Sequence, residues 1–197
     1  EGLRKLSIHK LCTEAKLNKR YFYESFASLD AMAAALVDDL AEELITIGQN
    51  AALKGWQEGM DTPTLARHVL DRCISWMVDE PARTRLLFSS ASENPMAHEQ
   101  RKLIIRKMAR VLSSFSIQYH RAGEPLALAH LGSALLIGGT IEAIMTWLDD
   151  DVAVSREEFV EDIAHFWVAV GDSAVALALS RGVTPGDPPP GTDTSEI

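Results

Sequence analysis

The chain has 197 residues, of which 47% are hydrophobic and 24% charged, and its formal net charge is −9. This length suffices for one sizeable hydrophobic core, or for a small domain followed by a larger one. The negative net charge excludes nonspecific DNA binding by the whole surface, so any contact with nucleic acid must be confined to a basic segment.

A basic segment of this kind opens the chain. Residues 1–27 carry six Lys and Arg side chains against three acidic ones, a local net charge of +3, and the remainder of the chain is acidic. The N-terminal segment is therefore the expected contact with nucleic acid, and chance clustering in a short window is the alternative explanation for a charge of +3.

The cysteines and the apolar segments bear on the compartment. Cys12 and Cys73 lack the spacing of metal ligands, and each falls on an apolar helix face, as expected for buried thiols in a reducing compartment. No secretory signal is evident. The longest apolar segment, Leu126–Leu148, contains His130 and Glu142, so we expect no membrane span. These features predict a cytoplasmic protein.

Two short helices are predicted near the N-terminus. Ser7 can cap a first helix, and Leu17 in the connection is expected to fill the core between the two helices. Asn18 can cap the second helix. The apolar positions at helical spacing, which we expect to be buried, are Ile8, Leu11, Cys12, Ala15, Phe22 and Phe26.

The second helix leaves a cationic and aromatic face outside. Its exposed side chains are predicted to be Lys19, Arg20, Tyr21 and Tyr23. Such side chains suit contacts with phosphates and base edges in a DNA major groove. A short amphipathic helix pair also occurs in any α-helical bundle, so the pattern alone leaves a purely structural role open.

The run of residues 17–26, LNKRYFYESF, resembles the recognition helix of TetR-type transcriptional regulators. The resemblance covers residues 1–44 and implies a helix-turn-helix that contacts DNA. In that family a Gly usually stands at the position of Lys16 and a phosphate-binding Lys at that of Leu29, and the first helix has no counterpart in residues 1–5. The DNA-binding residues that this assignment gives are Ser7, Asn18, Lys19, Arg20, Tyr21 and Tyr23.

The remaining chain is predicted to be helical, with prolines near helix starts. A helix over 29–47 is expected to link the N-terminal segment to the rest, followed by helices over 63–79, 81–91, 95–121 and 125–148. Thr62 and Asn94 are plausible caps, and Ser155 with Glu158 predicts a capping box for a last helix that reaches about residue 180. Residues 183–197 are rich in Pro and Gly and are predicted to be flexible.

The last two helices, 125–148 and 155–180, are apolar on nearly all sides. A helix with one buried face keeps a polar stripe, so these helices must be covered on a second side. A central position in a monomer would explain one of them, whereas a homodimer would explain both. In the family that the chain resembles, the last two helices form a four-helix bundle with a second subunit.

Helix 95–121 separates an apolar arc from a basic face that contains Lys102, Arg106, Lys107 and Arg110. The basic face is either a second nucleic-acid patch or a solvated surface. The apolar arc predicts either ordinary core or the wall of an effector pocket. Glu142 interrupts an apolar helix and, if buried, would need a partner. The residues that we assign to ligand binding are Trp76, Met77, Phe88, Met108, Leu112, Phe115, Tyr119 and Glu142.

Patterns of catalytic chemistry are absent from the sequence. The six His residues form no pair at i and i+4, no glycine-rich phosphate loop occurs, and the acidic run of residues 149–151 follows a helix as solvated loop residues usually do. We therefore expect no enzyme activity, no cofactor and no metal.

The sequence as a whole predicts an all-α protein in two parts. Residues 1–47 form a helix-turn-helix head with a linking helix, residues 48–182 a helical domain for dimerisation and ligand sensing, and residues 183–197 a tail. The predicted function is that of a repressor that binds a palindromic operator as a homodimer and is released by a small apolar or amphipathic effector. The alternative is a helical ligand carrier or interaction protein in which the helix pair is structural only.

Overall fold

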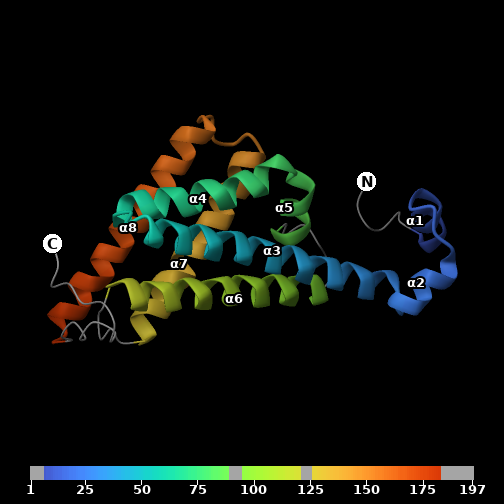
Figure 1. The fold of residues 1–197 in the computed structure, drawn as a ribbon, viewed down its shortest axis with the longest axis horizontal. Helices are drawn as coiled ribbons and strands as arrows, with labels where there is room; N and C mark the ends of the chain where they lie inside the picture. The colour runs from blue at the N-terminus through green and yellow to red at the C-terminus, as the bar shows by residue number, and fades with distance from the viewer. Residues whose placement is uncertain (1–6, 89–94, 121–125, 183–197) are drawn as a thin grey trace. The chain divides into compact units, whose positions relative to one another are not determined.

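The computed structural model describes residues 7–88, 95–120 and 126–182, with side chains for 7–88, 99–114 and 127–182. These residues form eight α-helices and, within the described ranges, no strand (Figure 1). The expected all-α class is confirmed. The predicted tail and the proposed cap Asn94 lie outside the described residues.

The chain divides into two compact units, residues 1–42 and 43–197. The first unit contains α1 (Ile8–Glu14), α2 (Lys19–Ser25) and the start of α3 (Leu29–Gln57). The boundary lies earlier than the expected residue 47. Glu43 already accepts a hydrogen bond from the Trp76 indole nitrogen at 2.8 Å, and Leu44 is buried among residues of the second unit.

The second unit contains the rest of α3 and five further helices. These helices are α4 (Thr62–Asp79), α5 (Pro81–Phe88), α6 (Pro95–His120), α7 (Leu126–Leu148) and α8 (Arg156–Ser180). Helix α6 packs against α7, and α4 packs against α8. Figure 1 shows α4 and α6 on opposite sides of the C-terminal part of α3. The core centres on fully buried side chains such as Ile74, Phe88 and Ile144.

Local capping fixes where most helices begin. The Ser155 side chain accepts from the Glu158 backbone N–H while the Glu158 carboxylate accepts from the Ser155 N–H, so the predicted capping box is confirmed. The N-cap of α4 is Asp61 rather than Thr62, because Pro63 occupies the first turn and the Asp61 carboxylate accepts from the Thr64 N–H. Helix α3 is longer than expected and continues to Gln57.

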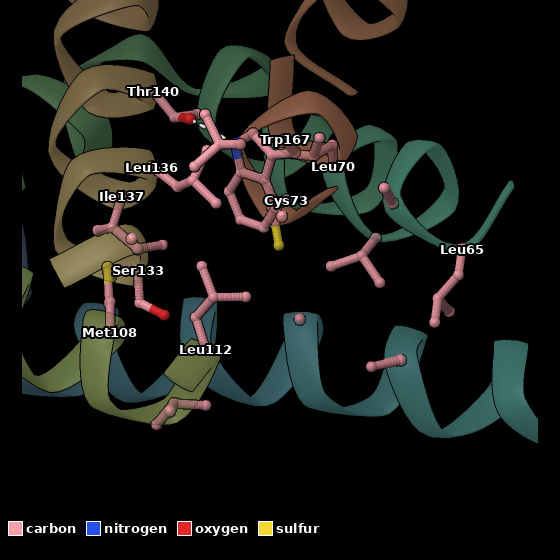
Figure 2. A pocket seen from close by; sticks show the side chains of 18 of the residues that line it. Leu65, Leu70, Cys73, Met108, Leu112, Ser133, Leu136, Ile137, Thr140 and Trp167 are labelled. Atoms are coloured by element: carbon pink, nitrogen blue, oxygen red, sulfur yellow. Dashed lines mark hydrogen bonds between the residues drawn. The ribbon is translucent and has the colours of Figure 1, made fainter. Parts of the chain in front are cut away.

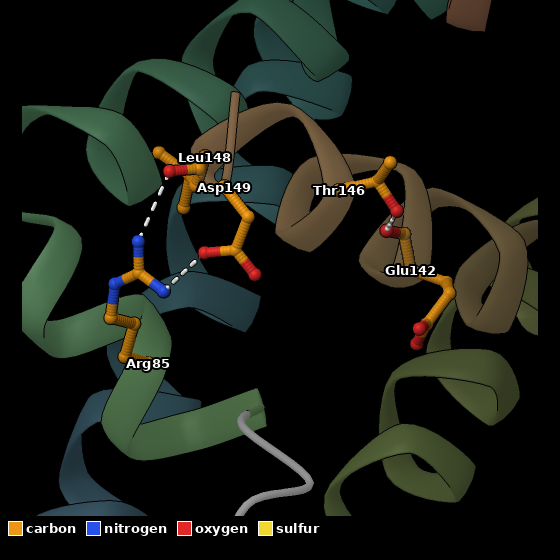
Figure 3. Close-up of polar contacts among 5 residues, drawn as sticks. All are labelled: Arg85, Glu142, Thr146, Leu148 and Asp149. Atoms are coloured by element: carbon orange, nitrogen blue, oxygen red, sulfur yellow. Dashed lines mark hydrogen bonds and ion pairs between the residues drawn. The ribbon is translucent and has the colours of Figure 1, made fainter. Parts of the chain in front are cut away.

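Ion pairs and hydrogen bonds tie the ends of α7 and α8 to the core. The Arg85 guanidinium donates to Asp149 Oδ1 at 2.6 Å and to the Leu148 carbonyl at 3.1 Å, which satisfies a carbonyl at the end of α7 (Figure 3). The Trp147 indole stacks on Phe159 with ring centroids 4.7 Å apart. The Asp149 carboxylate is therefore engaged by an arginine.

Candidate functional site

The two N-terminal helices form where the sequence predicts them. The Ser7 hydroxyl accepts from the Lys10 backbone N–H at 3.2 Å, and Asn18 Oδ1 accepts from the Arg20 N–H at 3.0 Å. Both predicted N-caps are therefore present. The Ser7 hydroxyl and the Asn18 amide keep donors that these bonds do not use, so both side chains remain able to contact phosphate.

The turn between these helices differs from expectation in two respects. Lys16 has a φ of +55°, a left-handed conformation that favours glycine and costs a lysine on the order of 1 kcal/mol. Leu17 was expected in the core, but 56% of its surface is exposed, because two seven-residue helices offer too little surface to enclose it. Ala15 is likewise exposed, since it follows the last residue of α1 as its C-cap.

The outer face of α2 is cationic and aromatic, as predicted. Lys19 and Arg20 are exposed, and Tyr21 and Tyr23 are 59% and 60% exposed. The inner face holds the buried Phe22, whose ring lies 5.8 Å from that of the half-buried Phe26. Burial of Phe22 thus fixes the rotation of α2 and leaves the two tyrosines pointing outward.

Arg20 is held by a neighbour on its own helix. Its Nε donates to Glu24 Oε1 at 2.7 Å, and its side chain remains 82% exposed. An exposed pair at this spacing contributes little stability, but it restricts the rotamers of the long side chain. The guanidinium still offers its outer N–H groups, so the pair orients Arg20 without preventing it from contacting an anion or a base edge.

The second unit encloses a partly open cavity of about 260 Å³. Side chains of α3, α4, α6, α7 and α8 line it, together with Phe88 of α5. Figure 2 shows Leu65 at one end, Met108 and Ile137 at the other, and Cys73 and Trp167 between them. Among the described residues, the lining includes no Asp, Glu, Lys, Arg or His side chain, so the cavity suits an apolar molecule.

A few polar groups interrupt the apolar wall. The Trp167 Nε1 donates to the Thr140 hydroxyl at 2.8 Å, a bond that joins α8 to α7 beside the cavity. Ser133 is 3% exposed and lines the cavity, and its hydroxyl is directed toward the side on which Met108 and Leu112 lie (Figure 2). Gln49, Thr62 and Cys73 are further polar side chains on the wall.

The pKa of the Cys73 thiol depends on the apolar surroundings of the cavity wall. Burial raises its pKa from 9.0 to about 12, and the nearby Arg72 opposes this only in part. Cys73 is half-buried by surface area, but the accessible part of its surface faces the apolar cavity, where a thiolate would lack solvation. The thiol is therefore protonated at neutral pH.

Only some of the predicted ligand-binding residues line the cavity. Met77, Phe88, Met108 and Leu112 line the cavity. Trp76 does not, because it is buried against Glu43, to which its indole donates. The side chains of Phe115 and Tyr119 lie outside the described residues.

Glu142, the carboxylate among the predicted ligand-binding residues, also lies outside the cavity lining. Its side chain is 72% exposed and contacts Arg101 Nη2 at 3.3 Å, on the side of α7 that faces α6 (Figure 3). An exposed carboxylate on an otherwise apolar helix needs no buried partner, because water solvates it. The Glu142 carboxylate therefore lies between solvent and Arg101 of α6, outside the cavity lining.

Sequence reasoning missed several residues of the cavity wall. Gly48 and Ala52 of α3, Ser133 and Thr140 of α7 and Trp167 of α8 all line it. The sequence offered one usable signal, the small and weakly polar residues that interrupt apolar helices at helical spacing. That signal is ambiguous, since periodicity shows which residues share a face and does not show whether that face is filled.

Helices α7 and α8 expose large apolar side chains. Leu131 and Leu135 of α7 are 68% and 63% exposed, and Phe166 of α8 is 60% exposed. By length and composition alone both helices could cross a membrane. Of the most apolar 18-residue stretch, only 28% is buried in α7 and only 11% in α8. Length and composition alone therefore do not distinguish a membrane span from a core helix for 126–148.

Comparison with known protein families and with curated proteins finds no match for this chain. Within the described ranges, no group of three or more His, Cys, Asp or Glu side chains is placed to hold a metal ion. The two candidate sites are thus the outer face of α2 and the cavity of the second unit.

Proposed function

We propose that this chain is a cytoplasmic transcriptional regulator of the TetR type, which binds a specific DNA sequence and is controlled by a small apolar molecule. The observation that carries the proposal is the outer face of α2, where Lys19, Arg20, Tyr21 and Tyr23 are exposed on a helix whose N-cap is Asn18. This combination of side chains matches the chemistry of major-groove recognition.

The exposed residues of α2 would contact different parts of the DNA. Lys19, Arg20 and Tyr21 would contact base edges, and the Tyr23 hydroxyl would hold a phosphate. The Arg20–Glu24 pair supports this division, because it limits the directions in which the guanidinium can point. Ser7 and Asn18 would add phosphate contacts at the starts of α1 and α2.

A homodimer would place two such helix pairs on one palindromic operator. The exposed apolar side chains of α7 and α8, Leu131, Leu135 and Phe166 among them, support a second copy of the chain as their cover. Gly138 and Gly139 favour the same occupant, because open space surrounds the position of a Cβ at each, which allows a partner helix to approach closely.

Ligand control would act through the spacing of the two DNA-binding segments. Successive major grooves on one face of DNA lie about 34 Å apart, and only a narrow range of spacings fits two of them. A molecule in the cavity that favours a different spacing would reduce operator affinity by population shift. The proposed regulator is therefore a repressor released by its effector.

DNA binding is tested by selecting duplexes from a random library and titrating them against the wild type and matched variants. We expect Arg20→Ala to reduce discrimination at one base pair by about 1–3 kcal/mol, and Tyr23→Phe to weaken binding to selected and random duplexes alike. Arg72→Ala, which removes the same charge from an exposed position on α4, is the control and should have no effect. Equal losses on selected and random DNA for Arg20→Ala would contradict the assigned role.

The dimer is tested by sedimentation. Leu135→Arg or Phe166→Arg would place an unpaired charge in an apolar interface and should give monomers that also lose DNA affinity. Leu103→Arg alters an equally exposed leucine on α6 and should leave the dimer intact. Intact dimers for all three variants would place the interface elsewhere.

A helical ligand carrier is the second candidate, and the cavity favours it as much as it favours a regulator. The salt dependence of DNA binding separates the two functions. A regulator that contacts several phosphates loses affinity steeply as salt rises, whereas a carrier has no DNA affinity to lose.

A further inference from the structure

We propose that the cavity binds an uncharged, mostly apolar molecule of about ten or more non-hydrogen atoms, which carries one hydrogen-bonding group next to Ser133. The inference deepens the ligand-sensing part of the proposed function and rests on it only for the consequence at DNA. It narrows the range of apolar and amphipathic effectors to neutral ones.

The composition of the cavity wall excludes charged ligands. No described residue that lines the cavity carries a formal charge, and the glutamine, threonines and serine among them are the only side chains with amide or hydroxyl groups. A carboxylate, phosphate or ammonium group that entered would lose its hydration and gain no counter-charge. The raised pKa of Cys73 follows from its burial in the same wall and agrees with this exclusion of charge.

The volume of the cavity sets the size of the ligand. A cavity of roughly 150 Å³ lined by aliphatic and aromatic side chains accepts benzene. The cavity of about 260 Å³ therefore accommodates at least a bicyclic ring system or a chain of similar size. Trp167, which lies beside the middle of the cavity in Figure 2, offers a flat aromatic surface to such a ring.

Ser133 supplies the polar end of the site. Its side chain is almost completely buried, and its hydroxyl projects into the cavity from α7. A buried hydroxyl is costly without a hydrogen-bond partner, so a ligand oxygen or nitrogen beside it is favoured. Thr140 is less available, because its oxygen already accepts a hydrogen bond from Trp167.

Three probes that share one ring system test the ligand class. Naphthalene, 1-naphthol and 1-naphthoate differ only in carrying no polar group, a neutral hydroxyl or a carboxylate at neutral pH. Their affinities are measured by displacement of the uncharged fluorophore N-phenyl-1-naphthylamine from the full chain. We expect 1-naphthol to bind most tightly, naphthalene several-fold less tightly, and 1-naphthoate at least tenfold less tightly than 1-naphthol.

Gly132 provides the variant that locates the binding. It lines the cavity, and nothing lies within 4 Å of the position that a Cβ would occupy there. The Phe side chain of Gly132→Phe should fill the cavity and abolish displacement of the fluorophore by the probes. Gly132→Ala is the matched control, and it should retain most of that displacement. Gly132→Leu replaces the Phe variant if the latter lowers the melting temperature. Ser133→Ala should reduce the affinity of 1-naphthol to that of naphthalene.

Each result decides one part of the proposal. Binding of 1-naphthoate as tight as that of 1-naphthol, or binding of none of the probes, would overturn the ligand class. If Ser133→Ala still preferred 1-naphthol to naphthalene, the proposed hydrogen bond to Ser133 would be contradicted. If folded Gly132→Phe bound the probes as tightly as the wild type, the probes would bind outside this cavity. Operator binding is measured separately, so 1-naphthol that binds without releasing DNA would contradict the sensing function alone.

Discussion

The two units of the chain use helices in opposite ways. Residues 7–42 form two seven-residue helices and the start of α3, and their chemically distinctive groups, the Lys, Arg and Tyr of α2, are exposed. The described part of residues 43–182 has an extensive apolar core, and its distinctive feature is the space enclosed by that core. A surface site requires only that one face be fixed, whereas an interior site requires that several long helices be packed with one volume left empty.

The largest expected effect concerns the core of the second unit. Ile74 is fully buried and does not line the cavity, so Ile74→Ala should cost about 2–5 kcal/mol of its free energy of unfolding. Leu103→Ala, at a site that is 58% exposed, should change it by less than about 0.5 kcal/mol. Denaturant titration measures both values, and similar costs for the two variants would contradict the burial described above.

The second prediction uses the pH dependence of stability. Because the pKa of Cys73 is raised from 9.0 to about 12 on folding, its protonated thiol favours the folded state at pH values below 9. As pH rises above 9 the unfolded chain loses this proton first, so stability should fall by up to about 1.4 kcal/mol per pH unit from this group. The same titration of Cys73→Ala should have a shallower slope, and an identical slope would show that the thiol is not desolvated.

A third prediction compares the same substitution at two glycines of the second unit. A Cβ at Gly55 would overlap the Leu65 side chain and lie 3.1 Å from Met60 Sδ, whereas one at Gly132 would meet open space. Gly132→Ala should therefore stabilise α7 by about 0.5–1 kcal/mol, since alanine favours the helix. Gly55→Ala should lose that gain to overpacking and destabilise by about 1 kcal/mol or more. Thermal unfolding would show whether the signs differ as expected.

The smallest expected effect lies in the first unit. Lys16→Gly should stabilise the helix pair by about 1 kcal/mol, because glycine adopts the positive φ of this turn without strain. Lys10→Gly, in the middle of α1, should destabilise the pair by about 0.5–1 kcal/mol. Amide hydrogen exchange across residues 7–26 reports both changes without interference from the second unit. A Lys16→Gly variant that exchanges as fast as the wild type, or faster, would mean that the turn is not strained.

The sequence by itself determined most of the helices. Ser7, Asn18 and Ser155 are caps in the structure because a cap acts on backbone N–H groups two or three residues away, and Pro81 and Pro95 begin helices because proline restricts only its own neighbourhood. The exposure of the α2 face followed from the same short-range geometry, since the burial of Phe22 directs the residues beside it outward.

Tertiary structure alone decided the cavity and the positions of individual residues around it. Met108 and Leu112 line it, whereas Trp76 and Glu142 lie elsewhere, although all four were predicted to bind the ligand. Helical periodicity specifies which side chains share a face. Whether that face meets another side chain, an empty volume or solvent depends on the distances between helices that are remote in the sequence, and no local pattern encodes those distances.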